Sequence, residues 1–140
     1  MAEVNKIMAT WKKDMLFHST NPSGELLMDA PVSVGGNNKG LSPKALMLSA
    51  LAGCTGIDVI SLLEKMRLEI KDLKINVEAE LTDEHPRYYN KVEVYYHFYG
   101  ENLDETKLKK IVDLSVEKYC GVMEMFRHFA EIEISIHFNE

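Results

Sequence analysis

Apolar and polar residues alternate along several short segments of the chain, a pattern typical of half-buried strands. In residues 73–82, for example, Leu73, Ile75 and Val77 alternate with charged or amide residues. The segments with this period are 6–12, 15–20, 24–30, 73–82, 91–100 and 131–138. Residues 21–24, NPSG, predict a turn between two of them, because proline fixes φ and glycine relaxes the backbone.

A helical pattern begins near residue 42. Ser42 is a suitable N-cap, Pro43 fits the first helical position, and no further proline occurs before Met66. Residues 45–52 are apolar apart from Ser49, which predicts a helix buried on several sides. A second helix is predicted over 104–119, where apolar residues follow the helical spacing, and a short third one over 122–129.

The predicted elements follow the order β-β-β-α-β-β-α-α-β. Strands and helices are partly segregated along the chain, so the expected fold class is α+β. We expect antiparallel sheets around a long buried central helix, in a single domain of residues 1–140. The Gly- and Asn-rich segment 31–43 predicts a loop within that domain. Because the central helix is apolar on so many sides, a homodimer is the expected way to cover it.

Composition narrows the classes of function. The chain has 140 residues, of which 46% are hydrophobic and 27% charged, as in globular proteins. Its net charge of −6 argues against nucleic acid or an anionic membrane as the main partner. No uninterrupted apolar run reaches ~18–20 residues, and the N-terminal residues lack a signal-peptide pattern. We therefore expect no transmembrane helix and a cytoplasmic location.

Cys54 lies in the run SALAGCTGID, within the predicted central helix. Gly53 and Gly56 flank it, and each glycine inside a helix costs about 1 kcal/mol relative to alanine. Such small residues would let a ligand or another backbone approach the sulfur. The alternative is that Cys54 is an inert core residue, because buried free cysteine behaves as a small hydrophobe.

Cys120 lies where one predicted helix ends and another begins. The amides of a helix starting there would lower the pKa of the thiol, whereas the alternative is again a core cysteine. A permanent disulfide is not expected in a reducing compartment. If the two cysteines meet, one sulfur can become a sulfenic acid with which the other condenses.

Few residues other than the two cysteines suggest a functional site. A reactive thiolate needs a positive partner, and Arg87 lies in a loop that could reach a cleft. Asp58 lies one helical turn after Cys54, where a cap or an ion pair is its expected role. The five histidines show no metal-ligand spacing, and no phosphate-binding or nucleophile-elbow motif occurs. We expect neither a metal nor a cofactor.

Two segments resemble the OsmC/Ohr family of peroxiredoxin-like proteins, in particular its YhfA-like branch. GLSPKALMLSALAGCTGIDVISLLEKMR is similar to the central-helix signature of that family, and DLSVEKYCGVMEMF to its second-cysteine segment. GELLMDA, ahead of the loop, is also similar. The likeness runs through nearly the whole chain in the same order.

The resemblance implies an intertwined homodimer with active sites at the subunit interface. It implies that Cys54 attacks a hydroperoxide, preferably an organic one, that Cys120 resolves the product, and that a dithiol supplies electrons. The glutamate that the family carries ten positions before the first cysteine is Lys44 here, and no arginine precedes Arg67. Lys44 or Arg87 would then have to supply the activating charge, although a lysine lacks the bidentate fork of an arginine.

Three functions follow from these observations. The first is thiol-dependent reduction of organic hydroperoxides through Cys54 and Cys120, weakened by the missing glutamate and arginine. The second is a non-catalytic protein of the same fold that senses redox state or binds a hydrophobic thiol. The third is a structural dimer with inert cysteines.

Overall fold

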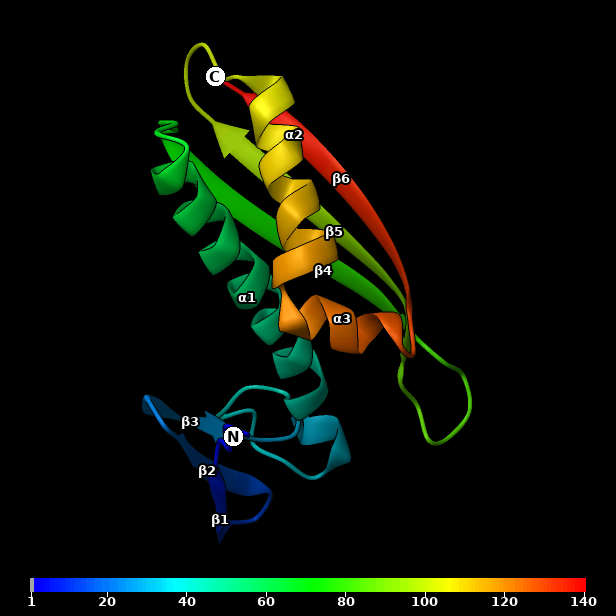
Figure 1. Cartoon of the computed structure of the whole chain (residues 1–140). Helices are drawn as coiled ribbons and strands as arrows, with labels where there is room; N and C mark the ends of the chain where they lie inside the picture. The colour runs from blue at the N-terminus through cyan, green and yellow to red at the C-terminus, as the bar shows by residue number, and fades with distance from the viewer. Residues whose placement is uncertain (1) are drawn as a thin grey trace. The chain divides into compact units, whose positions relative to one another are not determined.

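The computed structural model describes residues 2–140 and has the expected α+β class and element order. The chain forms two compact units, Met1–Met47 and Leu48–Glu140. In the first unit, β1 (Met8–Lys13), β2 (Leu16–Asn21) and β3 (Gly24–Met28) form an antiparallel meander (Figure 1). The NPSG turn joins β2 to β3, with Asn21 opposite Gly24. The alternation of apolar residues therefore placed all three strands.

Asp29 organises the loop that follows β3. Its carboxylate accepts the backbone N–H groups of Ala30, Asn37 and Lys39 at 2.7, 3.3 and 3.0 Å. These hydrogen bonds, with that from Lys39 the strongest, hold the pKa of Asp29 below its ordinary value. The segment predicted as a loop also contains one short 3₁₀ turn, η1 (Val32–Val34). The loop is thus an ordered structure built around one buried carboxylate.

The second unit holds a three-stranded sheet covered on one face by helices (Figure 1). Its strands β4 (Asp72–Leu81), β5 (Tyr89–Tyr99) and β6 (Glu131–Asn139) lie in that order. β4 and β5 pair antiparallel, but β6 pairs parallel with β5, which differs from the expected antiparallel sheets. The physical reason is the helical crossover between β5 and β6, because such a connection returns the chain in the same direction.

The core of this unit forms where β5 meets the helices. β5 buries Val92, Val94, Tyr96 and Phe98 at alternate positions, each with no exposed surface. α2 (Glu105–Leu114) and α3 (Gly121–Arg127) cover this face with their own buried side chains, Leu108, Ile111, Val112, Met123 and Phe126. The period-two pattern of β5 and the 3.6-residue pattern of the helices thus mark two apolar surfaces that pack on each other.

α1 (Pro43–Lys65) begins at Pro43, and the Ser42 carbonyl accepts the first helical hydrogen bond from the Leu46 N–H at 2.8 Å. Its buried residues form one stripe with a spacing of four: Leu51, Thr55, Val59 and Leu63. Burial on several sides is therefore not found in the single chain. By length and composition alone α1 could also cross a membrane, a test that core helices of soluble proteins pass too.

The predicted helix over 104–119 consists of two kinds of helix. α2 is capped by Asp104, whose side chain accepts the Lys107 N–H at 3.1 Å. After Leu114 the chain widens into a π-helical turn, η2 (Ser115–Tyr119), closed by the Cys120 N–H donating to the Ser115 carbonyl at 2.8 Å. Single π turns in α-helices are rare and occur often at functional sites. This one ends at the second cysteine.

Candidate functional site

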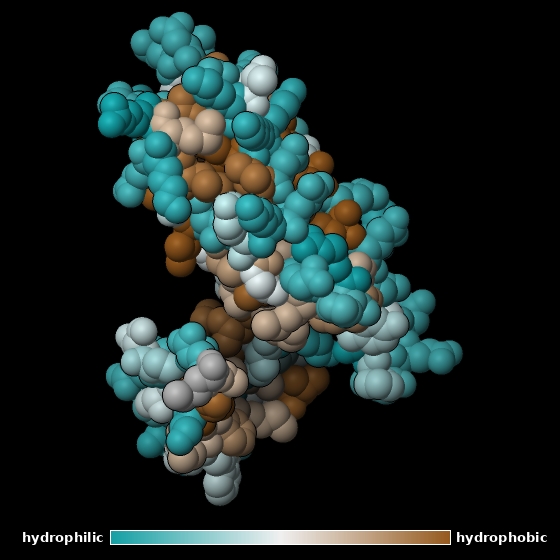
Figure 2. Space-filling model, in the orientation of Figure 1, coloured by the Kyte–Doolittle hydropathy of each residue, from teal (hydrophilic) through white to brown (hydrophobic). Residues whose placement is uncertain are grey.

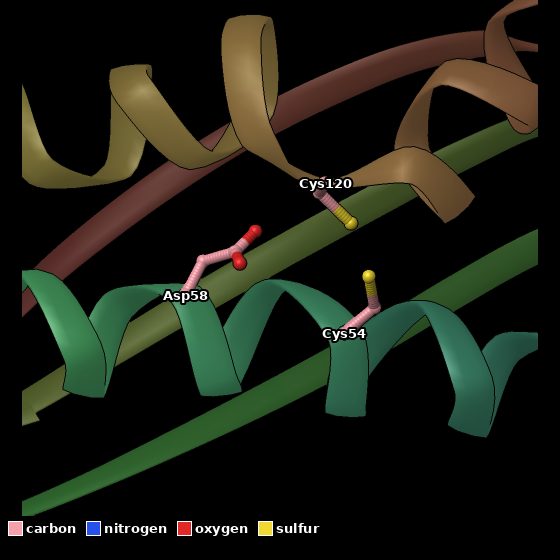
Figure 3. A group of neighbouring side chains, drawn as sticks. All are labelled: Cys54, Asp58 and Cys120. Atoms are coloured by element: carbon pink, nitrogen blue, oxygen red, sulfur yellow. The ribbon is translucent and has the colours of Figure 1, made fainter. Parts of the chain in front are cut away.

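The site is built where α1 passes the end of the π turn. Cys54 and Asp58 project from successive turns of α1, and Cys120 comes from the residue after η2. The two sulfur atoms and a carboxylate oxygen of Asp58 all lie within 4.8 Å of one another. Figure 3 shows the two sulfurs pointing toward each other, with the carboxylate beside them. Residues 66 positions apart in the sequence thus form one cluster, and both cysteines are free thiols.

Cys120 is the buried member of the pair, with 3% of its surface exposed. The Met123 N–H donates to its sulfur at 3.3 Å, as expected for a cysteine that precedes a helix. Burial nevertheless raises the pKa of Cys120 to about 12, assisted by a hydrogen bond with Cys54 and by the charge of Asp58. The Met123 amide does lower this pKa, as expected of a helix N-terminus, but desolvation outweighs that one N–H donor and the net pKa is raised.

Cys54 is partly exposed and is the thiol that a ligand can reach. The glycines beside it line a separate groove. This groove, of about 890 Å³ between α1 and β4, is lined by Gly53 and Gly56 together with Ile57, Ile60 and Ile75 among others. A Cβ atom on Gly56 would lie 3.2 Å from Cδ1 of Ile75, so this glycine lets β4 approach the helix closely.

Asp58 has a different role from the cap or ion pair expected for it. It forms no salt bridge in the part of the chain that the structure describes, and the Ser115 hydroxyl donates to its Oδ2 at 3.1 Å. A half-buried carboxylate without a cation is costly, and such groups are characteristic of functional sites. Its spacing of four from Cys54 was visible in the sequence; its approach to Cys120 was not.

Three buried hydroxyls continue from Asp58 into the core. Ser115 Oγ lies 2.7 Å from Thr55 Oγ1, which lies 2.6 Å from the Tyr96 hydroxyl. All three residues have no exposed surface. No sequence motif marks this network, because its members come from α1, β5 and η2. The signal available in the sequence was the presence of small polar residues at core positions of two helices.

Arg87 and Lys44, the expected sources of positive charge, form no salt bridge with Asp58 within residues 2–140. The Arg87 Nε donates to the Thr82 carbonyl at 2.9 Å, within the connection between β4 and β5. No hydrogen bond within residues 2–140 joins Arg87 to the cysteine cluster. Lys44 is exposed in the first turn of α1 and belongs to the unit Met1–Met47. Their role in activating a thiolate stays a prediction.

The cluster suits thiol chemistry better than metal binding. Its two sulfurs and one carboxylate are the only set of three His, Cys, Asp or Glu ligands that converge in residues 2–140. Three ligands are one short of a closed zinc site, and Ser115 already occupies one carboxylate oxygen. His97 and His137 stack at 5.0 Å on β5 and β6, outside this cluster. We therefore interpret the cluster as a dithiol site.

Comparisons with known proteins identify the family of this chain. Residues 36–135 match the family described as OsmC-like protein. Protein YhfA from Escherichia coli K12 is 32% identical over 123 residues, which cover 87% of this chain and 89% of YhfA. A hypothetical protein from Aquifex aeolicus has a solved structure that is 32% identical, with a TM-score of 0.87 and 99% of both chains covered.

A more distant structure shares the fold. The organic hydroperoxide resistance protein OsmC from Legionella pneumophila is 16% identical, with a TM-score of 0.72 and 98% of both chains covered. At this identity the likeness concerns the fold alone. The family match, by contrast, covers most of the chain and includes both cysteines. This protein therefore belongs to the OsmC-like family.

Proposed function

We propose that this protein reduces organic hydroperoxides, with Cys54 as the attacking thiol and Cys120 as the resolving thiol. The observation that carries the proposal is the approach of the two free sulfurs within 4.8 Å. Their different burial supports the assignment of roles, because the partly exposed Cys54 can meet a substrate and the buried Cys120 cannot. Family membership and the name of the Legionella protein are consistent with this chemistry.

The proposed cycle conserves atoms and electrons. The Cys54 thiolate attacks the terminal, hydrogen-bearing oxygen of the hydroperoxide, the O–O bond breaks, and the departing alkoxide takes up a proton to leave as an alcohol. Cys54 is then a sulfenic acid, which condenses with Cys120 to give a disulfide and water. A dithiol reductant, converted to its own disulfide by exchange, restores both thiols. The proposal requires no metal and no bound cofactor.

A preference for organic substrates follows from the surroundings of the pair. The residues packed around the cluster belong to an apolar core, and alkyl groups gain more than hydrated peroxides from such contacts. We expect the alkyl chain to lie along α1, next to Cys54.

Within residues 2–140 no cation forms a salt bridge with Asp58 beside the thiols, which favours a second candidate. Asp58 is the charged group next to the sulfurs, and neither Arg87 nor Lys44 is bonded to them within the described chain. A carboxylate disfavours a thiolate, which would slow the attack on peroxide. In this alternative the pair switches between dithiol and disulfide as a redox sensor, or holds a hydrophobic thiol, without rapid turnover.

A homodimer in the cytoplasm completes the proposal. Ile57 and Ile60 of α1 are 73% and 44% exposed beside the groove, where an added Cβ on Gly53 would touch no atom. In Figure 2, hydrophobic side chains reach the surface in the part of the second unit that holds α1. A second copy of the chain would bury this apolar face, as symmetric dimers commonly do.

Peroxide consumption separates the candidates. Purified protein is incubated with cumene hydroperoxide and a dithiol, and peroxide loss is followed for the wild type, Cys54→Ser and Cys120→Ser. The proposal predicts that Cys54→Ser loses nearly all activity, because no other described thiol reaches the surface. Ser135→Ala, on β6 and away from the cluster, is the matched control. Equal rates for the wild type and Cys54→Ser would exclude the peroxidase, and a single stoichiometric oxidation without turnover would favour the sensor.

A further inference from the structure

The Ser115 hydroxyl has two acceptors, Asp58 Oδ2 at 3.1 Å and the Thr55 carbonyl at 3.5 Å, and the shorter contact favours Asp58. An ionised carboxylate only accepts, so Ser115 donates its single hydrogen to Asp58. The Ser115–Thr55 hydrogen bond must then be donated by Thr55, and the Thr55–Tyr96 bond by Tyr96. Burial raises the pKa of Tyr96 to about 12, so its hydroxyl keeps the hydrogen that begins this chain. Every donor points toward Asp58, and bonds aligned in this way strengthen one another.

This arrangement fixes one carboxylate oxygen and leaves the other free. Oδ2 receives the bond from Ser115, while the carboxylate faces two sulfurs that have no other acidic neighbour in the cluster (Figure 3). The titratable groups that face one another here are Asp58 and Cys54 from α1, Cys120 after η2, and Tyr96 from β5. Three secondary-structure elements therefore hold an unpaired carboxylate against a dithiol.

We propose that Asp58 is the general base that takes the proton of Cys120 when the disulfide forms, and that Ser115, Thr55 and Tyr96 position it. The proposal rests on the proposed function for its oxidant. Cys120 Sγ attacks Cys54 Sγ, the S–S bond forms and the S–O bond of the sulfenic acid breaks. Asp58 accepts the thiol proton and returns it to the departing hydroxide, which leaves as water.

The buried thiol needs such a base. The pKa of Cys120 is about 12, so at neutral pH very little of it is thiolate, and the thiolate is the nucleophile. The pKa of Cys120 is raised partly by the negative charge of Asp58, and an oxygen of that same carboxylate lies within 4.8 Å of the Cys120 sulfur. A positioned base typically accelerates such steps by about 10²–10⁴-fold. In this proposal the Asp58 carboxylate assists disulfide formation by Cys120 and does not activate Cys54.

The test uses Ellman's reagent, so that it does not depend on peroxide chemistry. The reduced protein reacts at Cys54 and releases one thionitrobenzoate; Cys120 then attacks the mixed disulfide and releases a second one, a step that Cys120→Ser abolishes. In Asp58→Asn we expect the first release to keep its rate or to become faster, because the amide keeps the shape and the Ser115 bond while a negative charge beside the thiols is removed. We expect the second release to fall at least about 10²-fold at pH 7.

The pH profile distinguishes a base from a purely structural role. In Asp58→Asn the second release should rise about tenfold per pH unit between pH 6 and 8, because hydroxide replaces the carboxylate as base, while the wild type should change much less. Asp58→Glu should recover part of the rate. Asp113→Asn, an exposed carboxylate on α2, is the matched control.

If the second release in Asp58→Asn has the same rate and the same pH dependence as in the wild type, the proposal is overturned. If that variant does not fold, Ser115→Ala decides: a slower second release with a steeper pH slope supports the proposal, and an unchanged one overturns it. Loss of peroxide turnover in the wild type would contradict the proposed function while leaving this result intact.

Discussion

The two cysteines show how strongly position decides the chemistry of one residue type. Cys54 and Cys120 are chemically identical and lie in one cluster, yet one is partly exposed and the other is 3% exposed. Cys120 has a backbone donor that favours its thiolate, but burial dominates and raises its pKa to about 12. At the scale of the residue, the site therefore pairs the accessible thiol of Cys54 with the thiol of Cys120, which stays protonated at neutral pH unless a base takes its proton.

This raised pKa predicts a loss of stability in alkaline solution. Below pH 9.0, the ordinary pKa of the thiol, Cys120 is protonated in both the folded and the unfolded chain. Above that pH the unfolded chain releases the proton while the folded chain keeps it, so the free energy of unfolding falls as pH rises. The slope from this one group is at most about 1.4 kcal/mol per pH unit. Urea unfolding of the reduced protein between pH 8 and 10 measures it.

The variant Cys120→Ala serves as the control for that measurement. The smaller side chain lowers the stability at every pH, but the slope between pH 9 and 10 should become shallower because the titrating group is gone. Slopes that are the same in the wild type and Cys120→Ala would contradict the burial argument.

At the scale of the element, α1 has two faces with different tasks. The stripe of Leu51, Thr55, Val59 and Leu63 is buried, and Cys54 and Asp58 lie next to it in the sequence of the helix. The neighbouring face keeps Ile57 and Ile60 exposed beside the groove along β4. Exposed apolar surface of this kind on a small protein marks an interaction site.

We expect that Ile57→Lys converts the dimer to monomer at micromolar concentration, since it places a charge in a surface that a second copy would bury. Light scattering coupled to size exclusion measures the mass directly. Met125→Lys, at an exposed position of α3, is the matched control and should leave the mass unchanged. A wild-type chain that is monomeric at the same concentration would contradict the proposed dimer.

The π turn explains why part of the site could not be predicted from the sequence. Apolar spacing predicts one helix through residue 119 with Ser115 and Tyr119 on its buried stripe, and Ser115 is indeed buried. The π-helical turn η2 then changes the register, so Tyr119 is 49% exposed, and Arg127 holds this turn by donating to the Val116 carbonyl at 2.6 Å. Periodicity marks Ser115 as a core position but does not give its partner, so its approach to Asp58 emerges only in three dimensions.

At the scale of the whole molecule, the sequence predicted the order and class of the elements but not all their pairings. The alternation in residues 131–138 predicted a strand, but only the helical crossover made β6 parallel to β5. The Cys54–Cys120 pairing was implied by a resemblance and is now supported by geometry. The sequence predicts only a cap or an ion pair for Asp58, because its partners Ser115 and Cys120 lie more than fifty residues away along the chain.

The central claim is that Cys54 and Cys120 form one redox pair. Its most direct measurement is mass spectrometry of the reduced protein after one equivalent of cumene hydroperoxide, followed by peptide mapping without reductant. The account predicts a loss of about 2 Da, from two thiol hydrogens, and a peptide linked between Cys54 and Cys120 within one chain. Cys120→Ser should instead gain one oxygen at Cys54. A wild-type chain that accumulates oxidised Cys54 and never forms the linked peptide would contradict it.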